Sequence, residues 1–124
     1  MSNAGVTALV PMAHVQDMPA SIAFYAKIGL EIVNQVTPDG ADHPNWVWLR
    51  GGRAELMLAL ASEPVVPGQQ AVLFYTYCAE IAATRAAFEA AGLSPSAIAR
   101  PFYNPGGEFR LVDPDGYILY VAQI

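Results

Sequence analysis

The sequence predicts an α+β fold in which two βαβββ modules pair into a curved mixed sheet around a cavity. Three observations predict it. The order strand, helix and three strands occurs twice along the 124 residues. A glycine suited to a helix end follows each predicted helix, at Gly29 and at Gly92. A segment rich in proline and glycine, residues 62–69, separates the copies. Because each module alone would expose one face of its sheet, the two are expected to pair.

The chain is expected to form one domain over residues 1–124. Residues 1–5 form an N-terminal segment in which Ser2, Asn3 and Ala4 resemble the remnant of a cleaved tag. The modules are predicted at 6–61 and 70–124, joined by the 62–69 linker. Hydrophobic residues make up 54% and charged residues 14% of the chain, which favours a packed core over disorder.

The first module is predicted to open with a strand over 6–15, where valines and a threonine lie among apolar residues. A helix follows, beginning near Asp17 and Pro19 because proline suits a first helical turn. Further strands are predicted at 31–37, 45–50 and 53–61. The last two are joined at Gly51 and Gly52, which indicates a tight hairpin.

The second module repeats this order. A strand is predicted over 71–77, and an alanine-rich helix over 80–91. Three strands are predicted at 97–103, 108–112 and 117–123. Residues 113–116, with the sequence Asp-Pro-Asp-Gly, suit the tight turn between the last two.

The charge and the cysteine content exclude several classes of partner. The net charge of −5 disfavours nucleic acid and anionic membrane surfaces, which attract basic proteins. Cys78 is the one cysteine, so no intramolecular disulfide is possible and a cytoplasmic location is expected. No signal peptide and no apolar run long enough to span a bilayer is recognised.

Three segments carry a family resemblance. Residues 15–25 with Gly29 and Leu30, residues 52–58, and residues 113–117 resemble the opening, the fourth strand and the ending of vicinal-oxygen-chelate proteins. This superfamily includes glyoxalases, dioxygenases and bleomycin resistance proteins. The resemblance covers nearly the whole chain and implies the same two-module fold.

Metal-dependent members of that family bind a divalent ion through His, Gln or Glu side chains on strands one, four, five and eight. The matching positions here are Val10, Glu55, Val72 and Tyr120. Valine cannot bind a metal, and tyrosine does so only as a phenolate, so one carboxylate remains. The resemblance therefore implies a branch without metal or other cofactor. A shift of one or two residues in the fifth strand would bring Gln70 to the site.

Side chains two apart on a strand share a face, so the neighbours of these positions are expected to line the cavity. The predicted ligand-binding residues are Val10, Met12, His14, Trp46, Trp48, Glu55, Met57, Val72, Phe74, Tyr103 and Tyr120. Alternatives remain for several of them. Trp46 and Trp48 form either a stacking pair or ordinary core. Glu55 either lines the site or pairs with Arg53 or Arg110, and Tyr103 either borders a lid or packs on the surface.

Two functional readings follow from the resemblance. The first is a binder of a small aromatic or cationic molecule, without catalysis and acting as a homodimer, similar to the antibiotic-sequestering branch. The second is an enzyme, a lyase or a dioxygenase. It would use Glu55 or His14 as a general base, or it would use a divalent metal if the ligand register is misread. A measurement of metal content distinguishes the metal-dependent enzyme from the non-catalytic binding protein.

Overall fold

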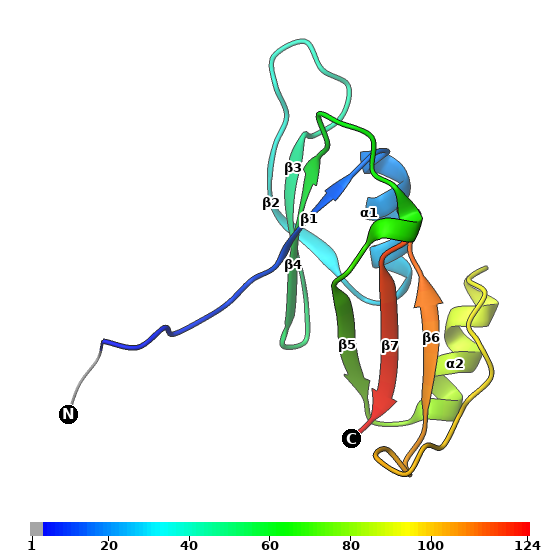
Figure 1. Ribbon diagram of the computed structural model, residues 1–124. Coiled ribbons are helices and arrows are strands. Elements are labelled where there is room, and N and C mark those ends of the chain that lie inside the picture. The colour runs from blue at the N-terminus through cyan, green and yellow to red at the C-terminus, as the bar shows by residue number, and fades with distance from the viewer. Residues whose placement is uncertain (1–3) are drawn as a thin grey trace.

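The computed structural model describes residues 4–124, so Ser2 and Asn3 of the expected tag remnant lie outside the described residues. The elements in chain order are β1 (Met12–Val15), α1 (Met18–Lys27), β2 (Glu31–Val36), β3 (Trp46–Gly51), β4 (Ala54–Leu60), the 3-10 turn η1 (Pro67–Gln69), β5 (Leu73–Cys78), α2 (Ile81–Ala90), β6 (Glu108–Val112) and β7 (Ile118–Gln123). Two sheets lie side by side, and α2 flanks the second of them (Figure 1). The mixed α+β class predicted from the sequence is confirmed.

The first sheet has the strand order β1-β4-β3-β2. β1 runs parallel to β4, and the other two pairs are antiparallel. Alternate side chains of β3 and β4 enter the core, because period-two patterning places them on one face. The core residues contributed by these two strands are Val47, Leu49, Leu56 and Leu58. The opposite face is left for polar and aromatic side chains.

The second sheet has the order β5-β7-β6, with β5 parallel and β6 antiparallel to β7. Phe109, Leu111, Leu119 and Val121 point into the same core as the first sheet. The two sheets therefore share one hydrophobic core.

Helix α1 begins where the sequence predicted. The Asp17 carboxylate accepts a hydrogen bond from the backbone N–H of Ala20 at 3.1 Å, and Pro19 occupies the first turn. Gly29 ends the helix with a φ of +103°, a left-handed conformation that favours glycine.

The turn between β6 and β7 fastens α1 to the second sheet. Asp113 accepts a hydrogen bond from the Tyr25 hydroxyl at 2.7 Å, and Asp115 accepts one from the Ser21 hydroxyl at 3.3 Å. Asp115 also accepts a bond from the backbone N–H of Gln16 at 3.0 Å. Residues 113–116 thus do more than turn the chain, because their carboxylates satisfy buried groups of the first module.

Two predicted strands are shorter than expected, and proline accounts for both. β1 begins at Met12 rather than at residue 6, since Pro11 has no N–H to donate to a neighbouring strand. The strand predicted over 97–103 is reduced to one bridge between Ala99 and Glu108. Pro101 lies two residues after Ala99 and cannot donate a ladder hydrogen bond.

The N-terminal segment extends away from the body. The trace before β1 runs away from both sheets (Figure 1), and the side chains of Val6 and Leu9 are 87% and 83% exposed. The Pro11 carbonyl, next to β1, accepts a hydrogen bond from the Met57 N–H at 2.9 Å. Within the described part of the chain, neither helix is long and apolar enough to cross a membrane.

Candidate functional site

The face of the first sheet that points away from the core carries a tryptophan cluster, which we define as Trp46, Trp48, Arg50, Glu55 and Met57. The half-buried rings of Trp46 and Trp48 meet edge to face, with their centroids 6.5 Å apart. The register aligns Trp48 with Met57 and Arg50 with Glu55. Alternation along β3 and β4 therefore gathers these side chains as the sequence predicted.

Glu55 is held by its neighbours in this cluster. Its Oε1 accepts hydrogen bonds from Trp48 Nε1 at 3.1 Å and from Arg50 Nε at 3.0 Å, and Arg50 Nη2 lies 2.9 Å away. The Arg50 guanidinium also lies 6.0 Å from the Trp48 ring centroid. The expected partners Arg53 and Arg110 are wrong: Glu55 forms its ion pair with Arg50, which lies directly opposite it on β3.

The corresponding face of the second sheet carries a tyrosine cluster, which we define as Tyr75, Tyr77, Tyr103, Tyr120 and Glu108. The rings of Tyr75 and Tyr120 are stacked, 5.0 Å apart and inclined by 11°. Tyr77 lies 6.4 Å from Tyr75. Glu108 is only 3% exposed and accepts a hydrogen bond at Oε2 from the Tyr75 hydroxyl at 3.2 Å.

The electrostatics of the tyrosine cluster reflect this buried acid. Desolvation and the hydrogen bond to Glu108 raise the pKa of Tyr75 to about 12. Desolvation and the negative charge of Glu108 also raise the pKa of Tyr103. Both phenols are therefore neutral at physiological pH and serve as hydrogen-bond donors.

A hollow of about 260 Å³ lies between the two clusters. Glu55 lines it from β4 and Tyr75 lines it from β5, with Pro11 and Leu73 among the other lining residues. Each cluster thus contributes one residue to this hollow, while Leu56, Phe74 and Leu119 line it from the core side.

The first strand contributes less than was expected. Met12 and His14 alternate with the buried Ala13 and Val15, so both lie on the side away from the core, and both are exposed. Val10 precedes β1 and belongs to the departing N-terminal segment. His14 lines a separate hollow of about 410 Å³ beside the linker.

The predicted face of β5 is wrong by one residue. Phe74 packs toward the core, 5.8 Å from the Tyr117 ring, and Val72 precedes the strand. Tyr75 is paired in register with Tyr120 and occupies the face expected for Phe74. The sequence prediction missed Tyr75, Tyr77 and Glu108. The alternation of tyrosines at 75 and 77 was the one signal that could have revealed the first two.

The donor atoms do not fit a divalent metal. Within residues 4–124, no three His, Cys, Asp or Glu side chains are grouped so that they could hold an ion. Of the four family positions, only Glu55 offers a carboxylate, and its Oε1 is already bonded to Arg50 and Trp48. No step of a metal-dependent reaction can be derived from these residues.

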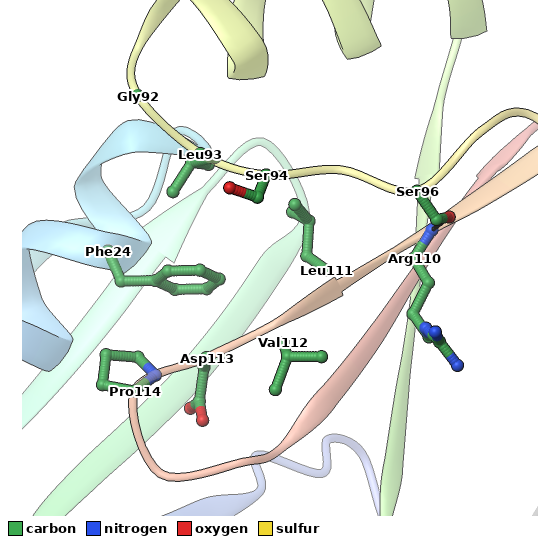
Figure 2. A pocket seen from close by; sticks show the side chains of 10 residues that line it. All are labelled: Phe24, Gly92, Leu93, Ser94, Ser96, Arg110, Leu111, Val112, Asp113 and Pro114. Carbon is green, nitrogen blue, oxygen red and sulfur yellow. Dashed lines mark hydrogen bonds between the residues drawn. The ribbon is translucent and has the colours of Figure 1, made fainter.

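A further hollow of about 610 Å³ lies between α1 and the segment that follows α2 (Figure 2). Figure 2 shows Phe24 and Asp113 at one end and Ser96 with Arg110 at the other. None of the predicted site residues lines this hollow, and Asp113 is already bonded to Tyr25.

Known proteins share this fold. The chain resembles a bleomycin-binding protein solved with bleomycin, at a TM-score of 0.75 and 20% identity over 96% of this chain and 99% of that one. It also resembles the antibiotic-binding protein TnmS3 from Streptomyces sp. CB03234, at a TM-score of 0.71 and 19% identity over 96% of this chain and 98% of that one. The fosfomycin resistance protein FosX from Listeria monocytogenes, solved as a mutant with Mn(II), matches at a TM-score of 0.69 and 11% identity over 95% of this chain and 90% of that one.

These matches show a shared fold. Proteins with this fold include a bleomycin-binding protein, an antibiotic-binding protein and a resistance protein solved with manganese. A search of curated proteins found no match. The model of the glyoxalase/bleomycin resistance protein/dioxygenase superfamily matches residues 9–121. The chain therefore belongs to this superfamily.

Proposed function

We propose that the protein binds a small planar aromatic molecule, carrying positive charge or hydrogen-bond donors, between its two sheets, and that it does so without a divalent metal and without catalysis. The observation that supports this proposal is the pair of aromatic clusters on the faces of the two sheets that point away from the core, of which Glu55 and Tyr75 line one hollow. Aromatic rings supply large apolar contact area and prefer to stack on other rings.

The charge of the chain supports a cationic ligand, because the net charge is −5. The similar structures of a bleomycin-binding protein and of TnmS3 support the same class of function. The residues at the metal positions support binding without an ion, since Val10 has no donor atom and Glu55 is bonded to Arg50.

Binding of proflavine, a planar aromatic cation, tests this proposal. We expect the dye to bind the wild-type protein equally well with EDTA and with added Mn, Ni or Zn. We expect Trp48→Ala to weaken binding about tenfold or more, because stacking on one ring contributes about 0.5–1.5 kcal/mol beyond the buried area. Fluorescence titration measures both effects.

Trp48→Phe is the matched control, because it keeps an aromatic ring on the same face and should retain most of the affinity. No binding of proflavine at all would contradict the proposal. Binding that requires a metal and is lost in Glu55→Ala would instead support the lyase or dioxygenase reading.

We also propose that the protein acts as a homodimer whose subunits are joined in part by the N-terminal segment. Val6 and Leu9 expose nearly their whole side chains on a segment that leaves the body. All six residues of β2 are exposed as well, including Val33 and Val36. A second copy that covers these surfaces would remove apolar area from water.

Substitution of Leu9 tests the dimer. We expect the wild-type protein to sediment as a dimer at micromolar concentration and Leu9→Asp to shift it toward monomer, because a buried carboxylate opposes apolar contact. Val66→Asp places the same charge on an exposed linker residue and should leave the dimer intact. A monomeric wild-type protein at 100 µM, or an unaffected Leu9→Asp dimer, would refute this assembly.

A further inference from the structure

Glu108 presents a buried acceptor without a donor. Its Oε2 accepts the Tyr75 hydroxyl, but Oε1 is buried and has no hydrogen-bond partner within the described residues. It is the one buried side-chain oxygen or nitrogen of residues 4–124 left in this state. A buried carboxylate oxygen without a donor is costly, and such groups are paired in most native structures.

The backbone holds Glu108 rigidly in this position. Glu108 begins β6 and lies opposite Ala122 of β7. Its N–H and C=O both bond to Ala99, at 2.9 Å and 2.8 Å. The backbone of Glu108 is therefore fixed between Ala99 and β7, and the hydrogen bond from the Tyr75 hydroxyl holds the carboxylate at Oε2.

The surroundings of Glu108 suit a cation better than a neutral donor. A hollow of about 260 Å³ is lined by Glu108 together with Tyr103 and Tyr120, and Tyr75, Tyr77 and Tyr103 line an adjoining hollow of about 300 Å³. The faces of aromatic rings attract cations through their quadrupoles. Arg110 also lines the first hollow, but no ion pair joins it to Glu108 within the described chain.

We infer that the tyrosine cluster is a subsite for an organic ammonium group, whose N–H donates a hydrogen bond to Oε1 of Glu108 while its carbon atoms lie against the tyrosine rings. This inference rests on the proposed function for its place in the larger binding site, and it names the part of the ligand that carries the charge. A primary or secondary amine fits, since it brings both a positive charge and a donor.

Tyr103 borders this subsite. It is 64% exposed and lies on the irregular segment 101–107. Because Oε1 is buried, a ligand reaches it only if a neighbouring side chain such as Tyr103 moves. The lid that the sequence suggested beside Tyr103 stays a prediction.

Three small probes of one shape test the subsite on the wild-type protein. Benzylamine is a cation with N–H donors, benzyltrimethylammonium is a cation without them, and benzyl alcohol is neutral. We expect benzylamine to bind about tenfold or more tightly than either of the others, measured by NMR titration of the tyrosine ring signals. Equal affinity for benzylamine and benzyl alcohol overturns the charge assignment, and equal affinity for the two cations overturns the bond to Oε1.

Glu108→Gln supplies the matching variant, because it keeps the shape and removes the charge. We expect it to weaken benzylamine binding about ten- to hundredfold, as for a hydrogen bond to a charged group. Glu80→Gln removes the same charge from an exposed residue that makes no capping bond, and it should bind as wild type. Unchanged binding in folded Glu108→Gln overturns the inference.

The two proposals fail separately. Proflavine binding that depends on Trp48, together with no preference among the three benzyl probes, retains the proposed function and overturns the ammonium subsite. A preference for benzylamine without proflavine binding retains the subsite and contradicts the proposed function. The wild-type probe series needs no variant, so a misfolded Glu108→Gln protein does not prevent the test.

Discussion

Asp113→Ala is expected to lower the free energy of unfolding by roughly 3–4 kcal/mol, because three donors would lose their acceptor. Asp113 is 4% exposed and accepts three hydrogen bonds. Its Oδ1 accepts from the backbone N–H groups of Asp115 at 2.9 Å and Tyr117 at 2.8 Å. Its Oδ2 accepts from the Tyr25 hydroxyl at 2.7 Å. Alanine would leave these donors buried without an acceptor.

Urea unfolding followed by tryptophan fluorescence measures this loss. Tyr25→Phe is the control, because it removes one of the three donors, and it should cost less than half as much. Asp113→Ala unfolding at the same urea concentration as Tyr25→Phe would contradict the expectation.

The pH dependence of stability provides a separate check on Asp113. Burial raises the pKa of this carboxyl above its ordinary value of 3.8, although the bonds from Tyr25 and the backbone oppose the shift. A raised carboxyl pKa means that the folded protein holds its proton more tightly than the unfolded chain. The stabilising contribution is therefore complete below pH 3.8 and is lost as the pH rises through the raised value. Asp113→Asn should remove this decline above pH 3.8, which urea unfolding at a series of pH values measures.

Gly51→Ala is expected to destabilise the fold by about 3 kcal/mol, at the upper end of overpacking effects. A Cβ at this position would collide with the backbone carbonyl oxygen of Gly29 and approach Leu30 Cα to 3.4 Å. Both are backbone atoms of the turn between α1 and β2, so they cannot rotate away as a side chain would. The end of β3 therefore packs directly on that turn.

Gly52→Ala is the matched control, because its added Cβ would meet no atom within 4 Å. Its cost should be the strain of a φ of +56°, about 1–2 kcal/mol. Thermal and urea unfolding of the two variants compares the cost of the steric contact at position 51 with the cost of the backbone strain at position 52. An equal loss of unfolding free energy in both variants would contradict the expectation that the Gly29 carbonyl oxygen excludes a side chain at position 51.

Much of the fold was predictable because local patterns determine it. The helix boundaries follow from the Asp17 cap and from Gly29, and both are observed. Trp46 and Trp48 share a face because strand side chains alternate, whatever the rest of the fold does. The two strands predicted too long show the limit of this approach, since the prolines at 11 and 101 outweigh their apolar neighbours.

The candidate site was less predictable because it depends on register and on distant partners. A shift of one residue in β5 places Tyr75 rather than Phe74 on the face that carries Tyr120, although both residues line the hollow between the sheets. Glu108 attracted no notice in the sequence, since a single glutamate at the start of a strand is ordinarily exposed. Its burial comes from pairing with Ala99 and Ala122, which no local pattern specifies.

The fastening of α1 by the turn between β6 and β7 has a consequence for biosynthesis. Tyr25 and Ser21 find their acceptors 88 and 94 residues later in the chain. A ribosome therefore releases the first helix long before the aspartates that complete its hydrogen bonds. We expect the nascent first module to stay loosely structured until β6 and β7 have emerged, so that the domain becomes resistant to proteolysis only after both strands have been synthesised.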